Sequence, residues 1–250
     1  MVSMRVPLLI LLSLLLLSFS RISQADTIHI AVASNFTGAM KELIAEFEKY
    51  SPHRVKASYG SSGKIYAQIQ HGAPFQIFFS ADQAKPLALY QQGLTQDSPF
   101  TYAFGALALW SSQTSFQHNE LAHLQSNDFN KLSLANPKLA PYGIATLEVL
   151  KNLTLIQATQ KKWVKGENIA QAYQFVGSGN ADLGFVALSQ VKHKASYWQV
   201  PSKLYSPIRQ DAVLLSSGQN NPAANAFLHF IRSEKSQTLI QSHGYTTVNQ

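Results

Sequence analysis

The feature that most constrains the fold is a unit repeated along residues 27–91: a short apolar strand, a loop of small polar residues, and a helix. In the first unit, apolar residues alternate over 28–32 and then recur at helical spacing over 40–47. The second unit has a strand at 55–59, and the third has one at 77–79. Strands that alternate with helices predict a mostly parallel sheet with helices on both faces.

The pattern restarts in the middle of the chain. An aromatic, β-prone segment at 101–111 predicts a strand that leaves the first lobe, and the segments 205–207 and 213–215 predict a second extended crossing. The other predicted strands and helices cover 132–135, 143–153, 168–176, 183–186, 222–231 and 234–243. We therefore predict an α/β protein of two lobes with a cleft between them. Lobe 1 would comprise 26–104 plus 207–250, and lobe 2 would comprise 105–206.

Residues 1–25 are typical of a cleaved secretory signal peptide. One basic residue, Arg5, precedes an apolar run at 7–19, and the small-residue site Ser23-Gln24-Ala25 follows. No later stretch approaches the ~20 apolar residues of a membrane-spanning helix. The chain has no cysteine, which excludes disulfides, thiolate catalysis and a lipid anchor on an N-terminal cysteine. We expect a soluble, monomeric protein of a bacterial periplasm.

The charge pattern argues against a nucleic-acid partner. Removal of the leader with its two arginines lowers the formal charge from +7 to +5. The basic residues are scattered, and the cluster around Lys161-Lys162 is not interleaved with aromatic residues as in a nucleic-acid groove. We interpret the basic residues as solvated surface.

Four predicted helix starts follow strand ends, which places backbone N–H groups and positive dipole ends at one edge of each sheet. They carry Ser34-Asn35, Ser61-Ser62, Tyr142-Gly143 and Asn168-Ile169. Each loop alone could be an ordinary helix cap, so the hypothesis rests on the set. None of the loops brings an acid, and a pocket that only donates favours a fully deprotonated oxyanion. Phosphate fits less well, because its remaining proton needs an acceptor.

Several sequence motifs of enzymes are present only in part. Ser61 and Lys64 match the Ser-x-x-Lys core of penicillin-binding enzymes, but the partner motifs are absent. The histidines lack metal-ligand spacing, and Asp82 is interpreted as a helix cap. A serine hydrolase using Ser61 or Ser62 stays an alternative, although His71 and Lys64 have no evident orienting partner. We expect no catalytic residue, no metal-cation ligand and no cofactor.

The same loops carry a resemblance to a known family, the periplasmic molybdate-binding proteins of molybdate ABC transporters, over essentially the whole mature chain. The matching segments are ASNFT (33–37), GSSG (60–63), YAQI (66–69), GAPF (72–75), FSAD (79–82), NP (136–137), APYG (140–143) and ADLGFVA (181–187). The resemblance implies a type II-like periplasmic binding protein that captures molybdate, and tungstate, and delivers it to an inner-membrane ABC permease.

The resemblance also implies a set of ligand donors. These are Ser34, Asn35, Ser62, Tyr142 and the backbone N–H of Ile169. Some members of the family use a tyrosine where this chain has Ala187, and we expect the Tyr142 hydroxyl to substitute for it. A receptor for another tetrahedral oxyanion such as sulfate, on the same fold, stays open, because the sequence does not reveal the size of the pocket.

Overall fold

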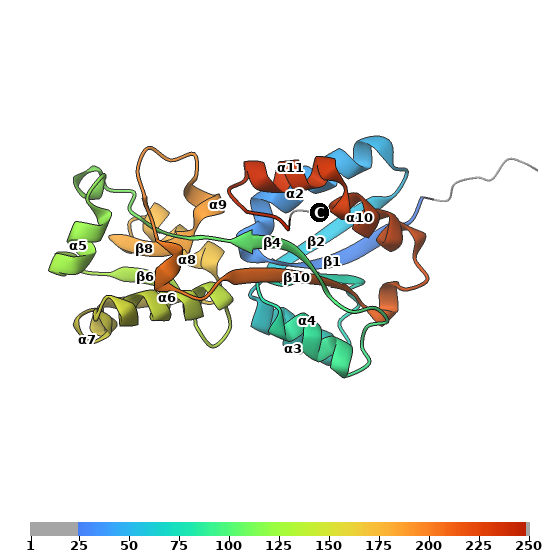
Figure 1. Cartoon of the computed structure of the whole chain (residues 1–250), viewed down its shortest axis with the longest axis horizontal. Coiled ribbons are helices and arrows are strands. Elements are labelled where there is room, and N and C mark those ends of the chain that lie inside the picture. Colours follow the sequence, from blue (N-terminus) through green and yellow to red (C-terminus); the bar gives the residue numbers. More distant parts are fainter. Residues whose placement is uncertain (1–24, 249–250) are drawn as a thin grey trace, which may run out of the picture.

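Two lobes lie side by side in the computed structural model, which describes residues 25–248 (Figure 1). Each lobe contains one five-stranded sheet with helices packed against it. The predicted leader falls almost wholly outside the described residues. The predicted α/β class with two lobes is confirmed.

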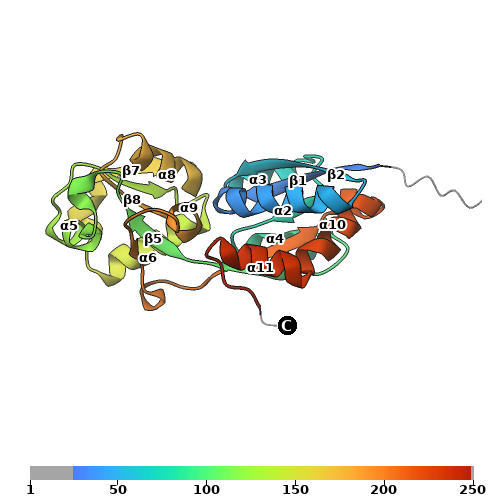
Figure 2. The same cartoon turned by 90° about the horizontal axis from the view of Figure 1, so that it is seen from above.

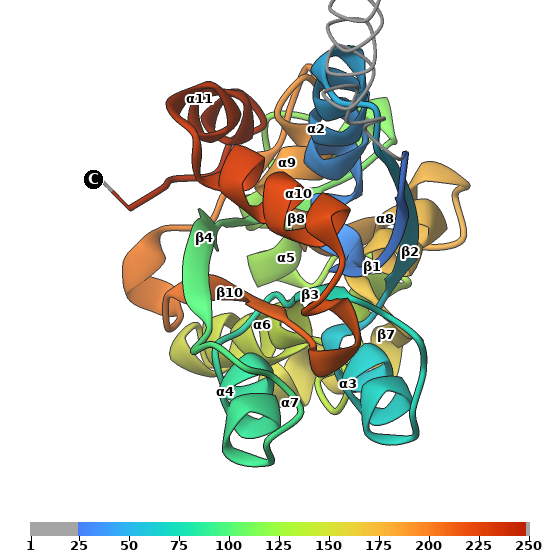
Figure 3. The same ribbon diagram turned by 90° about the vertical axis from the view of Figure 1, so that its right-hand side faces the viewer.

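Lobe 1 has the strand order β2-β1-β3-β10-β4. The strands are β1 (Thr27–Ala33), β2 (Arg54–Gly60), β3 (Ile77–Phe79), β4 (Phe100–Gly105) and β10 (Ile208–Leu214). The helices are η1 (Ser34–Phe36), α2 (Thr37–Tyr50), α3 (Ser62–Gln70), α4 (Ala84–Gln91), η5 (Ser216–Gly218), α10 (Pro222–Arg232) and α11 (Glu234–Ser242). Helices α2, α10 and α11 cover one face of this sheet, and α3 and α4 cover the other (Figure 3).

The alternation along β1 explains these two layers. Ile28, Ile30 and Val32 are fully buried under α2, α10 and α11, whereas Ala31 packs with α3 on the opposite face. Successive strand residues point to opposite faces, so the continuous apolar run at 30–33 requires cover on both sides. The strand's end, and with it the first polar loop, is thereby fixed at the edge of the lobe.

Lobe 2 has the strand order β7-β6-β8-β5-β9. The strands are β5 (Leu107–Trp110), β6 (Leu132–Ala135), β7 (Trp163–Gly166), β8 (Leu183–Ala187) and β9 (Trp198–Gln199). The helices are η2 (Thr114–Phe116), α5 (Glu120–Ser126), α6 (Pro141–Asn152), α7 (Ile156–Thr159), η3 (Gln160–Lys162), α8 (Ile169–Gly177), α9 (Leu188–Val191) and η4 (Ser202–Leu204). Sequence analysis did not predict β7, β9 or α5.

Two extended segments cross between the lobes (Figure 2). The single strand predicted at 101–111 is divided, since β4 ends at Gly105 in the first sheet and β5 begins at Leu107 in the second. The return crossing leads into β10. Both sheets are mixed, because β10 runs antiparallel to β3 and β4, and β5 runs antiparallel to β8 and β9. The parallel character that the sequence predicts is limited to β1–β3 and β6–β8.

No helix within residues 25–248 is both long enough and apolar enough to cross a membrane.

Candidate oxyanion-binding site

The four helix starts predicted from the sequence meet where the two lobes touch. Ala33 and Ala81 of lobe 1 belong to the same packed cluster as Tyr142 and Ile169 of lobe 2. Helices α8 and α9 of lobe 2 contact η1 of lobe 1. A backbone bond of 2.9 Å from the Gly63 N–H to the Leu139 carbonyl joins the start of α3 to the loop before α6. The strand ends of both lobes therefore face one another, with their polar loops between them.

All five predicted ligand residues lie at this junction and are buried. Their exposed fractions are 6% or less: Ser34, Asn35, Ser62, Tyr142 and Ile169. They come from η1, α3, α6 and α8, each at or within the first turn. The N–H groups of a first helical turn have no acceptor inside their own helix, so they can donate to a ligand.

The Asn35 side-chain amide is hydrogen-bonded to other side chains inside the protein. Its Nδ2 atom donates to Gln210 Oε1 at 2.9 Å and to the Tyr245 hydroxyl at 3.2 Å. An amide nitrogen carries two hydrogens, and both are used in these bonds. The donor that Asn35 can still offer to an anion is its backbone N–H, in the first turn of η1. A direct side-chain contact between Asn35 and an anion stays a prediction.

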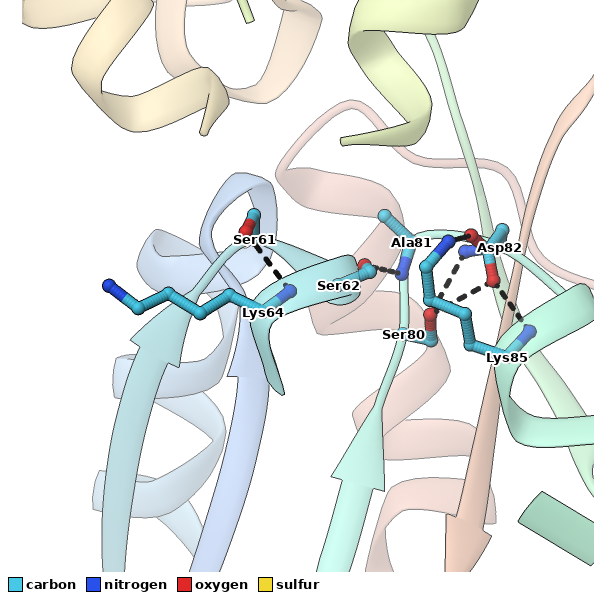
Figure 4. A network of polar contacts seen from close by, with 7 residues as sticks. All are labelled: Ser61, Ser62, Lys64, Ser80, Ala81, Asp82 and Lys85. Carbon is cyan, nitrogen blue, oxygen red and sulfur yellow. Dashed lines mark hydrogen bonds and ion pairs between the residues drawn. The ribbon is translucent and has the colours of Figure 1, made fainter. Parts of the chain in front are cut away.

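The two serines of the second loop have different partners (Figure 4). Ser61 is the N-cap of α3, and its Oγ accepts from the Lys64 N–H at 3.4 Å. Ser62 is the first residue of α3, and its Oγ accepts from the Ala81 N–H at 3.0 Å. A hydroxyl that accepts one hydrogen bond retains its own proton for donation. Ser62 is thus fixed in place by the next loop while its proton remains available.

Asp82 acts as a cap, as the sequence predicted. Its Oδ1 accepts from the Lys85 N–H at 3.1 Å, and its other oxygen pairs with the Lys85 ammonium group. Figure 4 shows this pair beside Ser80, to the right of Ser62 and Ala81. The Asp82 carboxylate is therefore neutralised by a residue of the helix that it caps.

The lobe 2 half is built from the starts of α6 and α8. Pro141 opens α6, and Tyr142 follows in its first turn with its hydroxyl directed at Gly105 of the crossing. Asn168 is the N-cap of α8 and accepts from the Ala170 and Gln171 N–H groups at 3.0 and 3.1 Å. These bonds leave the Ile169 N–H, the first of the helix, outside the cap.

Burial controls the protonation of the tyrosines at the junction. Desolvation raises the pKa of Tyr142 well above its ordinary value, and neighbouring Tyr245 and Tyr102 raise it further. Burial also raises the pKa of Tyr102 and of Tyr245. All three hydroxyls are protonated at neutral pH, so each has a proton to donate.

Charged side chains next to the junction form ion pairs with one another. Glu167, which precedes α8, pairs with Lys64 of α3 across the lobes at 3.0 Å. Residues 25–248 contain no group of three or more His, Cys, Asp or Glu side chains placed to hold a metal ion. The arrangement offers hydroxyl and N–H donors with paired carboxylates around them, which is the chemistry of an anion site.

Sequence reasoning missed three residues that hold the junction together: Gln210, Tyr245 and Ser189. The Tyr245 hydroxyl donates to the Asn35 carbonyl at 2.7 Å, and Ser189 of lobe 2 contacts the same carbonyl at 3.1 Å. Gln210 accepts from Asn35, as described above. Gln210 could have been noticed as a polar residue inside an apolar strand. The strand was not recognised at this point, because Arg209, Gln210 and Asp211 are three consecutive polar residues.

Neither serine of the second loop contacts a base in the part of the chain that the structure describes. Ser61 and Ser62 bond backbone N–H groups, and the Lys64 ammonium is turned toward Glu167. His71 lies exposed after the last turn of α3, at the opposite end from both serines. These contacts give the alternative of a serine hydrolase no support.

This geometry defines a class, the two-lobed solute-binding proteins. A family profile described as bacterial extracellular solute-binding protein matches residues 28–246, and the chain belongs to that family.

Particular relatives narrow the comparison. The chain is 48% identical to the molybdate-binding protein ModA of Azotobacter vinelandii, over 89% of this chain and 91% of that protein. It is 42% identical to ModA of Rhodobacter capsulatus, over 89% of both chains. The solved structure of the periplasmic molybdate-binding protein of Azotobacter vinelandii superposes with a TM-score of 0.85 at 37% identity, covering 89% of this chain and all of that one.

Proposed function

We propose that this protein captures molybdate, and tungstate, in the periplasm and delivers it as a monomer to an inner-membrane ABC permease. The observation that carries the proposal is the convergence of donors from four helix starts at the lobe junction. These donors come from both lobes. Lobe 1 provides the buried hydroxyl of Ser62, and lobe 2 provides the buried hydroxyl of Tyr142 and the N–H of Ile169. The similarity to molybdate-binding proteins of two bacteria supports it.

The chemistry of the donors favours a tetrahedral dianion without protons. Ser62 accepts from Ala81 and has a proton left, and Tyr142 is held protonated by burial. The carboxylates next to the junction are engaged by Lys85 and Lys64. A ligand that itself carries a proton would find both of these carboxylates already paired, and an unpaired buried donor costs about 1–3 kcal/mol.

Contacts across the junction support delivery as a closed complex. Gly63 bonds Leu139, Lys64 pairs with Glu167, and Ser189 bonds Asn35. Each contact joins an element of one lobe to an element of the other, so all of them form together when the lobes close. Closure about two crossings is a hinge motion of the kind found in periplasmic binding proteins. A permease that recognises surfaces on both lobes would then distinguish the loaded form.

A thermal-shift panel with molybdate, tungstate, sulfate, phosphate and vanadate tests the proposal. A ligand that binds only the native state adds ~2.7 kcal/mol at one hundred times its dissociation constant. We expect molybdate and tungstate to raise the melting temperature and equal sulfate or phosphate to leave it unchanged. An equal or larger shift with sulfate would contradict the molybdate assignment and favour the sulfate receptor.

A further inference from the structure

Gln210 lies at the point where the crossings leave lobe 1, and its side chain is completely buried. The pairing of β10 with β4 shifts register between Gln210 and Asp211, so that Tyr102 is the extra residue of β4. A bulge of this kind re-aims the side chains around it. Gln210 and Tyr102 thereby meet inside the lobe, next to the candidate site.

The Asn35 amide fixes the orientation of the Gln210 amide. Gln210 Oε1 accepts from Asn35 Nδ2 at 2.9 Å and lies 3.0 Å from the Tyr102 hydroxyl, whose single proton has a second acceptor at 3.0 Å, the Ser80 carbonyl. Because the oxygen faces the Asn35 donor, the NH2 group points the other way. The network therefore gives Gln210 a donor with a defined direction.

The Gln210 NH2 group points toward the Tyr142 hydroxyl. Within residues 25–248, Gln210 Nε2 and the Tyr142 hydroxyl oxygen are two of three buried side-chain polar atoms without a hydrogen-bond partner. Both atoms face Gly105, where a Cβ atom would lie 2.6 Å from the amide nitrogen and 2.2 Å from the hydroxyl. The absence of a side chain at Gly105 leaves the two groups facing each other across the same small space.

We propose that Gln210 is a positioning residue: its NH2 group donates to the Tyr142 hydroxyl oxygen and so directs the Tyr142 proton toward the bound oxyanion. A hydroxyl has one proton, and an acceptor nearby would divert it from the ligand. A donor on its oxygen has the opposite effect. Since Gln210 is itself oriented by Asn35, the chain from η1 through β10 to α6 couples the two halves of the site. This inference rests on the proposed function.

A double-mutant cycle tests the proposal by calorimetry with molybdate. Tyr142→Phe removes the hydroxyl, and we expect the affinity to fall about tenfold to a hundredfold. Gln210→Met, which keeps the length of the side chain, should cost about tenfold in the wild type and less than about twofold in the Tyr142→Phe background. Gln237→Met is the matched control and should change neither background, because the Gln237 amide donates to the Ile231 carbonyl within lobe 1.

Equal losses from Gln210→Met in both backgrounds would overturn the proposal. That outcome would mean that Gln210 contacts the anion itself or only supports the fold.

Gln210→Glu is a second variant, which should fold even if Gln210→Met does not. Its carboxylate can still accept hydrogen bonds from Asn35 and Tyr102. A buried glutamate has a raised pKa, so it takes up a proton as the pH falls from about 9 toward about 6. The protonated carboxyl group can donate to Tyr142 as the amide does, and we expect molybdate affinity to recover over this range while wild type stays flat. The recovery should be smaller with Tyr142→Phe, and a recovery of equal size would show an effect of charge alone and overturn the proposal.

Nuclear magnetic resonance of the ligand-free protein distinguishes a failure of this inference from a failure of the proposed function. The side-chain amide resonance of Gln210 should shift in Tyr142→Phe, whereas that of Gln237 should not. A Gln210 resonance that is unchanged both in the ligand-free protein and after addition of molybdate would show that the contact does not exist, whichever anion the protein binds. If the resonance shifts but wild type does not bind molybdate, the proposed function fails and the Gln210–Tyr142 contact stands.

Discussion

The two halves of the candidate site hold their donors in different ways. In lobe 1, Ser62 is anchored by the Ala81 N–H of the next loop in the same lobe, and its geometry does not depend on the partner lobe. In lobe 2, the Tyr142 hydroxyl has no hydrogen-bond partner within its own lobe and faces Gly105 and Gln210 of the crossings. Ser62 is therefore preorganised within lobe 1, whereas the Tyr142 hydroxyl becomes oriented only where the lobes meet.

This difference assigns separate roles to the two halves. A donor fixed before binding costs little conformational entropy when the ligand arrives, which favours capture by lobe 1. A donor that depends on the crossings responds to the angle between the lobes, so Tyr142 couples binding to closure. Substitutions at Gly105, Asn35, Ser62 and Lys64 test this division, and their effects on affinity should decrease in that order.

Gly105→Ala should have the largest effect. The new Cβ would lie 2.2 Å from the Tyr142 hydroxyl and 2.6 Å from Gln210 Nε2, so both groups must move. We expect calorimetry to show a loss of molybdate affinity greater than about 100-fold, since two polar contacts and closure are affected together. Gly177→Ala is the control, because its Cβ would meet only Trp110 at 3.9 Å. Wild-type affinity in Gly105→Ala would show that Tyr142 acts independently of the crossing.

Asn35→Asp should weaken binding by about 100-fold. A carboxylate can only accept, so it cannot donate to Gln210 Oε1 or Tyr245, and it places a negative charge beside an anion. At ~4 Å and an effective dielectric near 20, one unit-charge pair costs ~4 kcal/mol before relaxation. Asn221→Asp, at the N-cap of α10, is the matched control, because aspartate is also a good cap. Binding within about tenfold of wild type would place the anion away from η1.

Replacing Ser62 should mainly lower molybdate affinity, whereas replacing Ser61 should mainly lower the stability of the fold. Ser62→Ala removes a hydroxyl donor and leaves the Ala81 N–H unpaired, so affinity should fall about ten- to a hundredfold. Ser61→Ala removes the N-cap of α3, which costs about 1 kcal/mol of stability and changes affinity less. Calorimetry and thermal denaturation of both variants check this, and the reverse order of affinities would move the contact to Ser61.

Lys64→Gln should have the smallest effect. The Lys64–Glu167 pair joins the lobes, but both side chains are about half exposed, and such pairs contribute about 0.2–1 kcal/mol. We expect a loss of affinity below about fivefold that disappears at high salt. Lys49→Gln, which breaks an ion pair within lobe 1, should leave affinity unchanged. A large, salt-independent loss would mean that the pair controls closure.

Much of lobe 1 could be predicted from local patterns. The alternation of Ile28, Ile30 and Val32 and the apolar spacing along α2 specify a strand and a helix wherever they pack. The serine and asparagine loops could be found for the same reason, because capping residues act on the backbone beside them. In lobe 2, β7 escaped prediction because its sequence, Trp163–Gly166, contains a lysine and forms an edge strand that needs apolar residues on one face only.

The sequence by itself determined the class of elements, their order, and the positions of the four donor-bearing helix starts, because these follow from short-range periodicity and capping. Only the tertiary structure decided which of those donors remain available and which are used within the protein. Asn35 donates its two amide hydrogens to Gln210 and Tyr245, which follow it in the sequence by 175 and 210 positions. Gln210 is turned toward Tyr142 by the bulge in the pairing of β10 with β4. Such contacts carry no local signature, since their geometry exists only after segments far apart in the sequence have folded against each other.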